Sequence, residues 1–234
     1  MLVAPQAKDP IVLSYLALRK AVGDVAVGLP FALAIPWWVL QHHIIQSSIS
    51  AYYYTGMRNL FVGSLCAISL FMLCARGYDR KDEIAGVFSA LCALGVAFFP
   101  TAPDWGATQH QHDIGIVHYV FAGLLFSTLA YFCLVLFKMT AANHPLTRKK
   151  LQRNKIYTVC GCVIIASMLL IFVLKKILKI DYFPGHLGTL FCFESTALFA
   201  FGLAWLVKGE TFLKDENPEP SVILTTTKNP QPFG

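Results

Sequence analysis

The sequence predicts an all-α fold, a transmembrane bundle of six helices, from three observations. Of the 234 residues, 56% are hydrophobic and only 14% are charged, whereas a soluble domain carries about 25% charged residues. Six apolar runs approach the length of about 20 residues that a helix needs to cross the hydrocarbon core. The basic residues gather on one side of these runs. Because they flank apolar spans and form no patch on a soluble domain, nucleic acid is excluded as a partner.

The spans follow one another with short connections. The first contains Pro30 and Pro36, which are tolerated in a membrane helix and are expected to kink it. We expect residues 1–23 to precede the bundle, with an interfacial helix at 11–18. The polar, proline-bearing residues 209–234 are expected to form a disordered cytoplasmic tail. Within the membrane domain, 24–208, the predicted spans are 24–45, 59–76, 83–100, 114–138, 156–175 and 187–207.

Charge fixes the predicted orientation. With six spans both termini share one side, and fifteen of the 19 Lys and Arg residues fall on that side. Cytoplasmic connections are enriched in Lys and Arg. Both termini are therefore predicted to be cytoplasmic.

The histidines show the opposite bias. Histidine titrates near neutral pH and is the commonest metal ligand, so a group of them on one face is a candidate site. Six of the seven lie at the predicted outer ends of the spans or in the outer connections: His42, His43, His110, His112, His118 and His186.

The second outer connection holds an H-x-H pair, His110 and His112, with Asp113 beside it. If this segment is extended, both rings point to the same side. Imidazole and carboxylate ligands suit zinc, iron or copper. The alternative is a solvated loop that binds nothing.

Glu194 is predicted to lie inside the sixth span, eight residues after His186. A carboxylate at membrane depth is costly and is a functional hypothesis by default. The alternative is a protonated Glu194, hydrogen-bonded to a serine or tyrosine between helices. Together with His118 and Arg58, these residues are expected to face an outward pocket among the second, fourth and sixth spans.

The first outer connection carries three consecutive tyrosines and Arg58, the only arginine on the outer side. One interpretation is an interfacial aromatic belt. The other is a lip over a cavity, in which Arg58 binds an anionic head group or a carboxylate.

Two stretches, SSISAYYYTGMRNLFVGSLCA and ALGVAFFPTAPD…HDIGIVHYVFAGLLF, resemble uncharacterised bacterial integral membrane proteins of the domain-of-unknown-function 998 kind. In those proteins a Phe-Pro-Thr element, here Phe99 to Thr101, precedes a loop and a histidine that opens the next span, here His118. The resemblance covers about residues 47–135. It implies a six-span or similar bundle, and the bacterial inner membrane, without an activity.

A more distant similarity, in residue types, is to the alkaline ceramidase and adiponectin-receptor hydrolases, which hold zinc with three histidines. The H-x-x-x-H pair of their last helix has no counterpart here, because His186 is followed at that spacing by Leu190.

Three functions remain open. The first is a non-enzymatic membrane protein: a small transporter, a lipid-binding or assembly factor, or a subunit of a complex, with membrane lipids and protein as partners. The second is a metal-dependent hydrolase of a lipid or lipid-linked substrate. In it, His110, His112, His118 and His186 would supply the zinc ligands, Glu194 or Asp113 would move the proton, and Arg58 would hold a phosphate. The third is a protein with a single b-type haem between His118 and His186.

Overall fold

The computed structural model describes residues 10–40, 45–74, 80–140, 147–180 and 188–213. Four of the seven histidines lie outside these ranges: His42, His43, His144 and His186. Most of the predicted tail, from residue 214 onward, also lies outside them.

The described chain is helical and has six long helices. They are α1 (Pro10–Leu40), α2 (Arg58–Cys74), α3 (Arg80–Phe98), α4 (Gln109–Leu134), α5 (Arg148–Phe172) and α6 (Thr189–Lys208). Short helical turns flank three of them: η1 (Ser50–Tyr54), η2 (Leu136–Lys138) and η3 (Val173–Ile177). Each long helix overlaps one predicted span, so the predicted all-α fold is confirmed.

Four helical segments are long and apolar enough to cross a membrane. They are Ile11–Leu40, Gln109–Lys138, Arg148–Lys175 and Thr189–Lys208. Helix α2 is apolar but shorter. Helix α3 has 19 residues and begins with the charged run from Arg80 to Glu83. Its remaining 15 residues would extend over about 22 Å, less than the roughly 30 Å of a hydrocarbon core.

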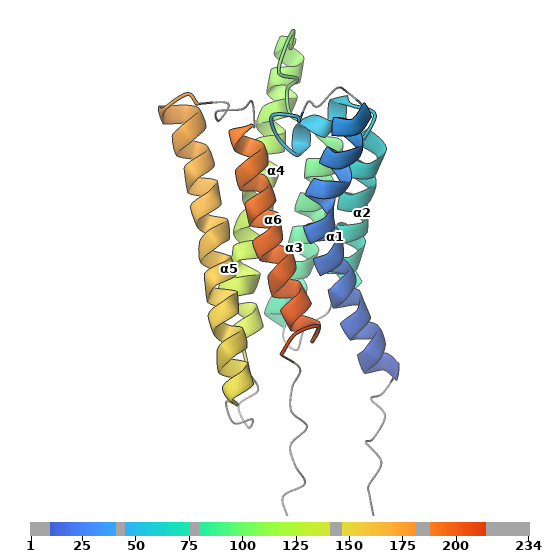
Figure 1. Ribbon diagram of the computed structural model, residues 1–234, viewed down its shortest axis with the longest axis vertical. Helices are drawn as coiled ribbons and strands as arrows, with labels where there is room; N and C mark the ends of the chain where they lie inside the picture. The colour runs from blue at the N-terminus through green and yellow to red at the C-terminus, as the bar shows by residue number, and fades with distance from the viewer. Residues whose placement is uncertain (1–9, 41–44, 75–79, 141–146, 181–187, 214–234) are drawn as a thin grey trace, which may run out of the picture.

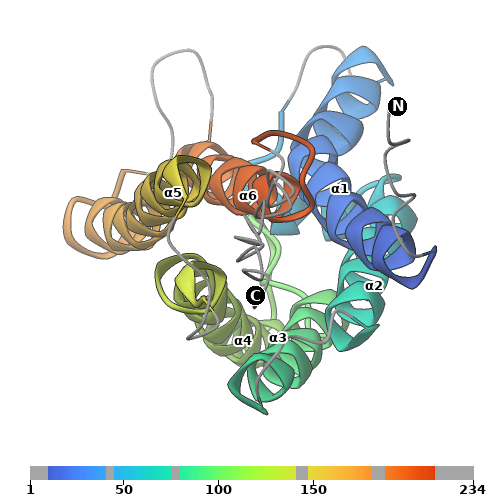
Figure 2. The same ribbon diagram turned by 90° about the horizontal axis from the view of Figure 1, so that it is seen from below.

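The helices run alternately up and down and form a closed ring. Each packs against the next along the chain, and α6 returns to pack against α1. Viewed along the bundle, α4 and α6 also touch, and α5 lies outside this pair (Figure 2). The first helix begins and the last one ends at the same end of the bundle (Figure 1).

Helix α1 is longer than the predicted first span. The expected separate helix at 11–18 is instead the beginning of one continuous helix of 31 residues, which contains both Pro30 and Pro36. Residues 11–18 keep the same helical path because no proline or glycine separates them from residue 19, and Ala, Leu, Arg and Lys favour helix.

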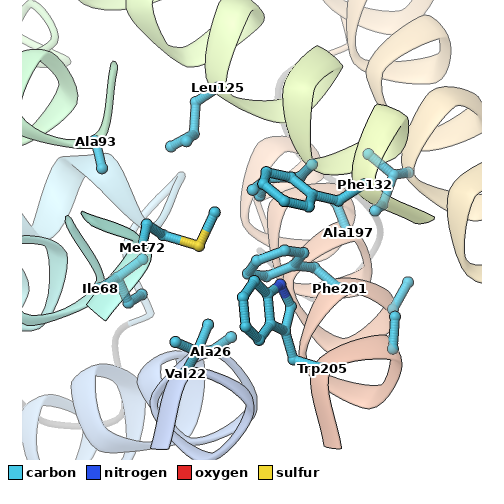
Figure 3. Packing of buried hydrophobic residues seen from close by; sticks show 14 of the residues in the cluster. Val22, Ala26, Ile68, Met72, Ala93, Leu125, Phe132, Ala197, Phe201 and Trp205 are labelled. Carbon is cyan, nitrogen blue, oxygen red and sulfur yellow. The ribbon is translucent and has the colours of Figure 1, made fainter. Parts of the chain in front are cut away.

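The core lies along the inner faces of the helices. Figure 3 shows Phe132 of α4 beside Phe201 and Trp205 of α6, with Met72 of α2 facing them. The ring centroids of Phe132 and Trp205 are 6.0 Å apart, and those of Phe201 and Trp205 are 5.9 Å apart. These side chains are almost fully buried, so the aromatic residues of α4 and α6 fill the centre of the bundle near the end that holds the two termini.

Two glycines let the last helix close on the first. A methyl group on Gly202 would lie 2.8 Å from the carbonyl oxygen of Gly23, and one on Gly23 would lie 2.9 Å from the carbonyl oxygen of Gly202. Small residues permit such close approach between membrane helices. We call this contact the α1–α6 seam.

Candidate functional site

At the end of the bundle opposite the termini, the chain between α1 and α2 folds over the start of α6. We call the set of residues that holds it there the polar cap: Ser47 to Tyr54, Thr101, Tyr119 and Glu194. The cap includes Glu194 from the predicted site, and it recruits hydroxyl groups that the sequence did not single out.

Glu194 holds the beginning of η1. Its Oε2 accepts a hydrogen bond of 2.7 Å from the backbone N–H of Ile49, and its Oε1 lies 3.4 Å from the hydroxyl of Ser50. The first N–H groups of a helix have no partner within the helix and are satisfied by acceptors such as carboxylates. Glu194 therefore supplies, from another helix, the cap that η1 lacks on its own Ile49 side chain.

The backbone of α6 is tied to the same segment. The N–H of Phe191 donates to the carbonyl of Ser47 at 3.0 Å. A methyl group on Gly188, just before α6, would overlap the carbonyl oxygen of Ser47. The φ of Gly188 is −62°, so the residue is needed here for close approach and not for an unusual backbone angle.

The three consecutive tyrosines point to three different neighbours, because a 3₁₀-helix advances by about 120° per residue. Tyr52 is fully buried and packs against Phe191, with ring centroids 6.3 Å apart. Tyr53 lies under the guanidinium of Arg58. Tyr54 donates from its hydroxyl to the carbonyl of Thr101 at 2.7 Å. The run thus connects α6, α2 and the segment before α4.

Burial affects two of these phenols. Desolvation raises the pKa of the Tyr52 hydroxyl, and the backbone of Gln46 partly offsets it. Desolvation and the neighbouring Tyr53 raise the pKa of Tyr54, while Arg58 lowers it. Both hydroxyls are therefore neutral at physiological pH and act as hydrogen-bonding groups.

The cap continues to α4. The hydroxyl of Thr101 lies 3.1 Å from that of Tyr119. Next to Tyr119, the buried His118 has its Nδ1 2.7 Å from the carbonyl oxygen of Phe99. Because a carbonyl only accepts, Nδ1 carries the proton. His118 thus pairs with the last carbonyls of α3 and holds the Phe-Pro-Thr element against α4.

The other two described histidines are exposed on the first turn of α4, which extends beyond its neighbours (Figure 1). The conditional interpretation of an extended H-x-H pair is wrong. Thr108 and Gln111 form a reciprocal capping box that starts the helix at Gln109, so His110 and His112 are about 200° apart around the axis. They also lie one and a half to two turns from His118.

The remaining predicted residues have local partners. Asp113 accepts from Gln109 at 3.0 Å on the exposed face of α4. Arg58 is exposed, donates to the Tyr53 hydroxyl, and lies 4.2 Å above that ring. Neither Asp113 nor Arg58 contacts Glu194 or His118 through a described hydrogen bond. The structure therefore does not join these four residues into one pocket.

No group of three or more His, Cys, Asp and Glu residues within the described ranges is placed to hold a metal ion. The described histidines do not form the expected cluster. His186, which the hydrolase and haem hypotheses both require, lies outside the described residues, so the complete predicted set stays a prediction.

Sequence reasoning missed Ser50, Tyr54, Thr101 and Tyr119 as members of the cap. Only one signal of this region was readable locally: the T-x-x-Q pattern at Thr108, which marks a helix start. The other contacts join residues 18 to 145 positions apart and depend on how the ring closes.

Comparison with known proteins adds no relative: no family model, no curated protein and no solved structure matches this chain.

Proposed function

We propose that the chain is a six-span membrane protein, with both termini in the cytoplasm, that binds phospholipid along α4. The polar cap serves to fix the fold at the outer end. This assignment is supported by what the polar residues of the cap contact: Glu194 binds a helix start, His118 binds a helix end, and Tyr54 binds the segment between α3 and α4.

The observation that carries the proposal is a pair of grooves on the outward side of α4. One, of about 400 Å³, runs between α3 and α4, and the other, of about 370 Å³, runs between α4 and α5. Ser127 and Tyr131 line both. Their linings are otherwise mostly apolar, which suits acyl chains.

Charge indicates which lipid fits. Lys81, in the first turn of α3, lines the groove between α3 and α4, as do Thr128 and Tyr131. An ammonium group at one end of an apolar groove suits a phosphate above an acyl chain, because Lys near a membrane surface attracts anionic head groups. We therefore assign this groove to a phospholipid, with its phosphate toward Lys81.

Native mass spectrometry of the detergent-purified protein tests the assignment by counting retained phospholipid. Ser127→Phe should reduce retention about fivefold, because a ring placed in both grooves removes contacts worth about 1 kcal/mol. Thr196→Phe is the matched control, since Thr196 is exposed on α6 and lines neither groove. Equal retention by the two variants contradicts the proposal.

The metal-dependent hydrolase and the single-haem protein remain the alternatives. Elemental analysis of the same preparation separates them: about one zinc per chain supports the hydrolase, and about one iron with a haem spectrum supports the cytochrome. Either result would replace lipid binding as the leading function.

A further inference from the structure

Four cationic side chains from three helices converge at the end of the bundle that holds the termini. They are Arg19 of α1, Lys150 and Arg153 of α5, and Lys208 of α6. We call them the basic cluster. None of them lines the grooves beside α4, so this is a separate site.

Two of the ammonium groups share one acceptor. Nζ of Lys150 lies 3.1 Å from the carbonyl oxygen of Phe137, and Nζ of Lys208 lies 3.5 Å from the same oxygen. Lys150 also reaches the carbonyl of Met139 at 3.3 Å. Lys208 lies 5.6 Å from the centre of the Phe137 ring. The ammonium groups are therefore close neighbours, held by neutral groups at the end of α4 and η2.

The two arginines lie close to this pair. Arg19 reaches the carbonyl of Lys208 at 3.5 Å and the hydroxyl of Tyr15 at 2.7 Å. Arg153 is only 7% exposed. The charges of Arg19, Lys150 and Arg153 all act on Lys208, and the one carboxylate that acts on it is that of Asp82.

The charges at this place do not balance. Asp82 and Glu210, two residues after Lys208, are the carboxylates nearest in the fold or the sequence, against four cations. Like charges in a partly buried site repel strongly, because the effective dielectric constant there is far below that of water. The carbonyl dipoles at helix C-termini offset only part of this repulsion.

A bound anion would remove the repulsion. Arg presents paired donors that match phosphate oxygens, and Lys adds a compact charge. Basic pockets between transmembrane helices on the cytoplasmic side bind the head groups of anionic lipids. We propose that Arg19, Lys150, Arg153 and Lys208 bind a phosphate group, carried by an anionic phospholipid or by a free phosphate ester.

The test measures binding to the full-length protein in a maltoside detergent. Short-chain phosphatidylglycerol, short-chain phosphatidylcholine and inorganic phosphate are titrated separately. Lys208→Gln and Lys150→Gln should each weaken phosphatidylglycerol binding about tenfold, because each removes a charge-assisted hydrogen bond. Lys208→Arg should retain most of it.

Lys155→Gln is the matched control. Lys155 is exposed on α5 at the same end, so its replacement lowers the net charge equally and should leave binding unchanged. Far-ultraviolet circular dichroism and size-exclusion profiles establish that each variant is folded.

The outcomes separate the sources of phosphate. Phosphatidylglycerol binding that inorganic phosphate does not displace supports a lipid ligand, and displacement by inorganic phosphate at similar concentration supports a free phosphate. Equal affinity for phosphatidylglycerol and phosphatidylcholine, or equal loss in Lys208→Gln and Lys155→Gln, overturns the phosphate site. Because the groove test changes Ser127 and not these cations, failure of one proposal is distinguishable from failure of the other.

Discussion

The two ends of the bundle use polar residues differently. In the polar cap, donors and acceptors from distant segments pair with one another: Glu194 with η1, and Tyr54 with Thr101. In the basic cluster, Lys150 and Lys208 turn to the same carbonyl. Paired groups of the cap are expected to contribute to stability, whereas crowded groups of one sign are expected to contribute to binding. Substitutions at the two ends should therefore have different effects on the folded protein.

The largest effect on stability is expected at Gly188. Gly188→Ala places a methyl group against the backbone of Ser47, which cannot yield as a flexible side chain does, so the cap must separate from α6. We expect a loss of about 3 kcal/mol in the free energy of unfolding, measured by denaturant titration in micelles. Gly28→Ala is the control: no atom lies within 4 Å of the added methyl group, and alanine favours helix. If both variants lose equal stability, the close docking of the cap is wrong.

A smaller loss is expected at Glu194. Glu194→Ala leaves the N–H of Ile49 and the hydroxyl of Ser50 without their acceptor, which costs about 2 kcal/mol for partly buried donors. Glu194→Gln keeps a carbonyl oxygen that can accept one of these bonds, so it should lose about half as much. The same titration checks both variants. Unchanged stability in Glu194→Ala would show that the carboxylate does not hold η1.

The smallest effect is expected in the basic cluster. In lipid-free detergent, Lys208→Gln removes one charge from a group that repels it and keeps an amide donor for the carbonyl of Phe137. The free energy of unfolding should change by no more than about 0.5 kcal/mol. A loss as large as that of Glu194→Ala would mean that Lys208 is a structural residue like those of the cap, and the contrast between the two ends would fail.

The sequence was sufficient for the helices because hydrophobic length is a local property. Helix starts were less accurate: α5 begins at Arg148, eight residues before the predicted span, because Thr147 caps it through a hydrogen bond to the N–H of Lys150. Charged residues lower the hydropathy of that first turn without opposing the helix. Hydropathy therefore marks the apolar part of a helix, and capping residues mark where it begins.

The partners of the polar residues were beyond the sequence. Glu194 was singled out for its cost in an apolar span, and a serine was expected among its partners. That the main chain of Ile49, 145 positions away, would bind it depends on the docking of η1 on α6. The charge count likewise placed Arg19, Lys150, Arg153 and Lys208 on one side. Their convergence follows from the order of helices around the ring.

The α1–α6 seam has a consequence for the synthesis of the chain. It joins Gly23 to Gly202, so the first helix made meets its second neighbour only after the last helix has left the ribosome. Until then, the face of α1 around Gly23 has no protein against it, and helices α2 to α5 can assemble only as an open arc. The final step of assembly is therefore a closure between the two ends of the chain. A ribosome stalled before residue 189 would hold an open intermediate that lacks both the seam and the Glu194 contact of the cap.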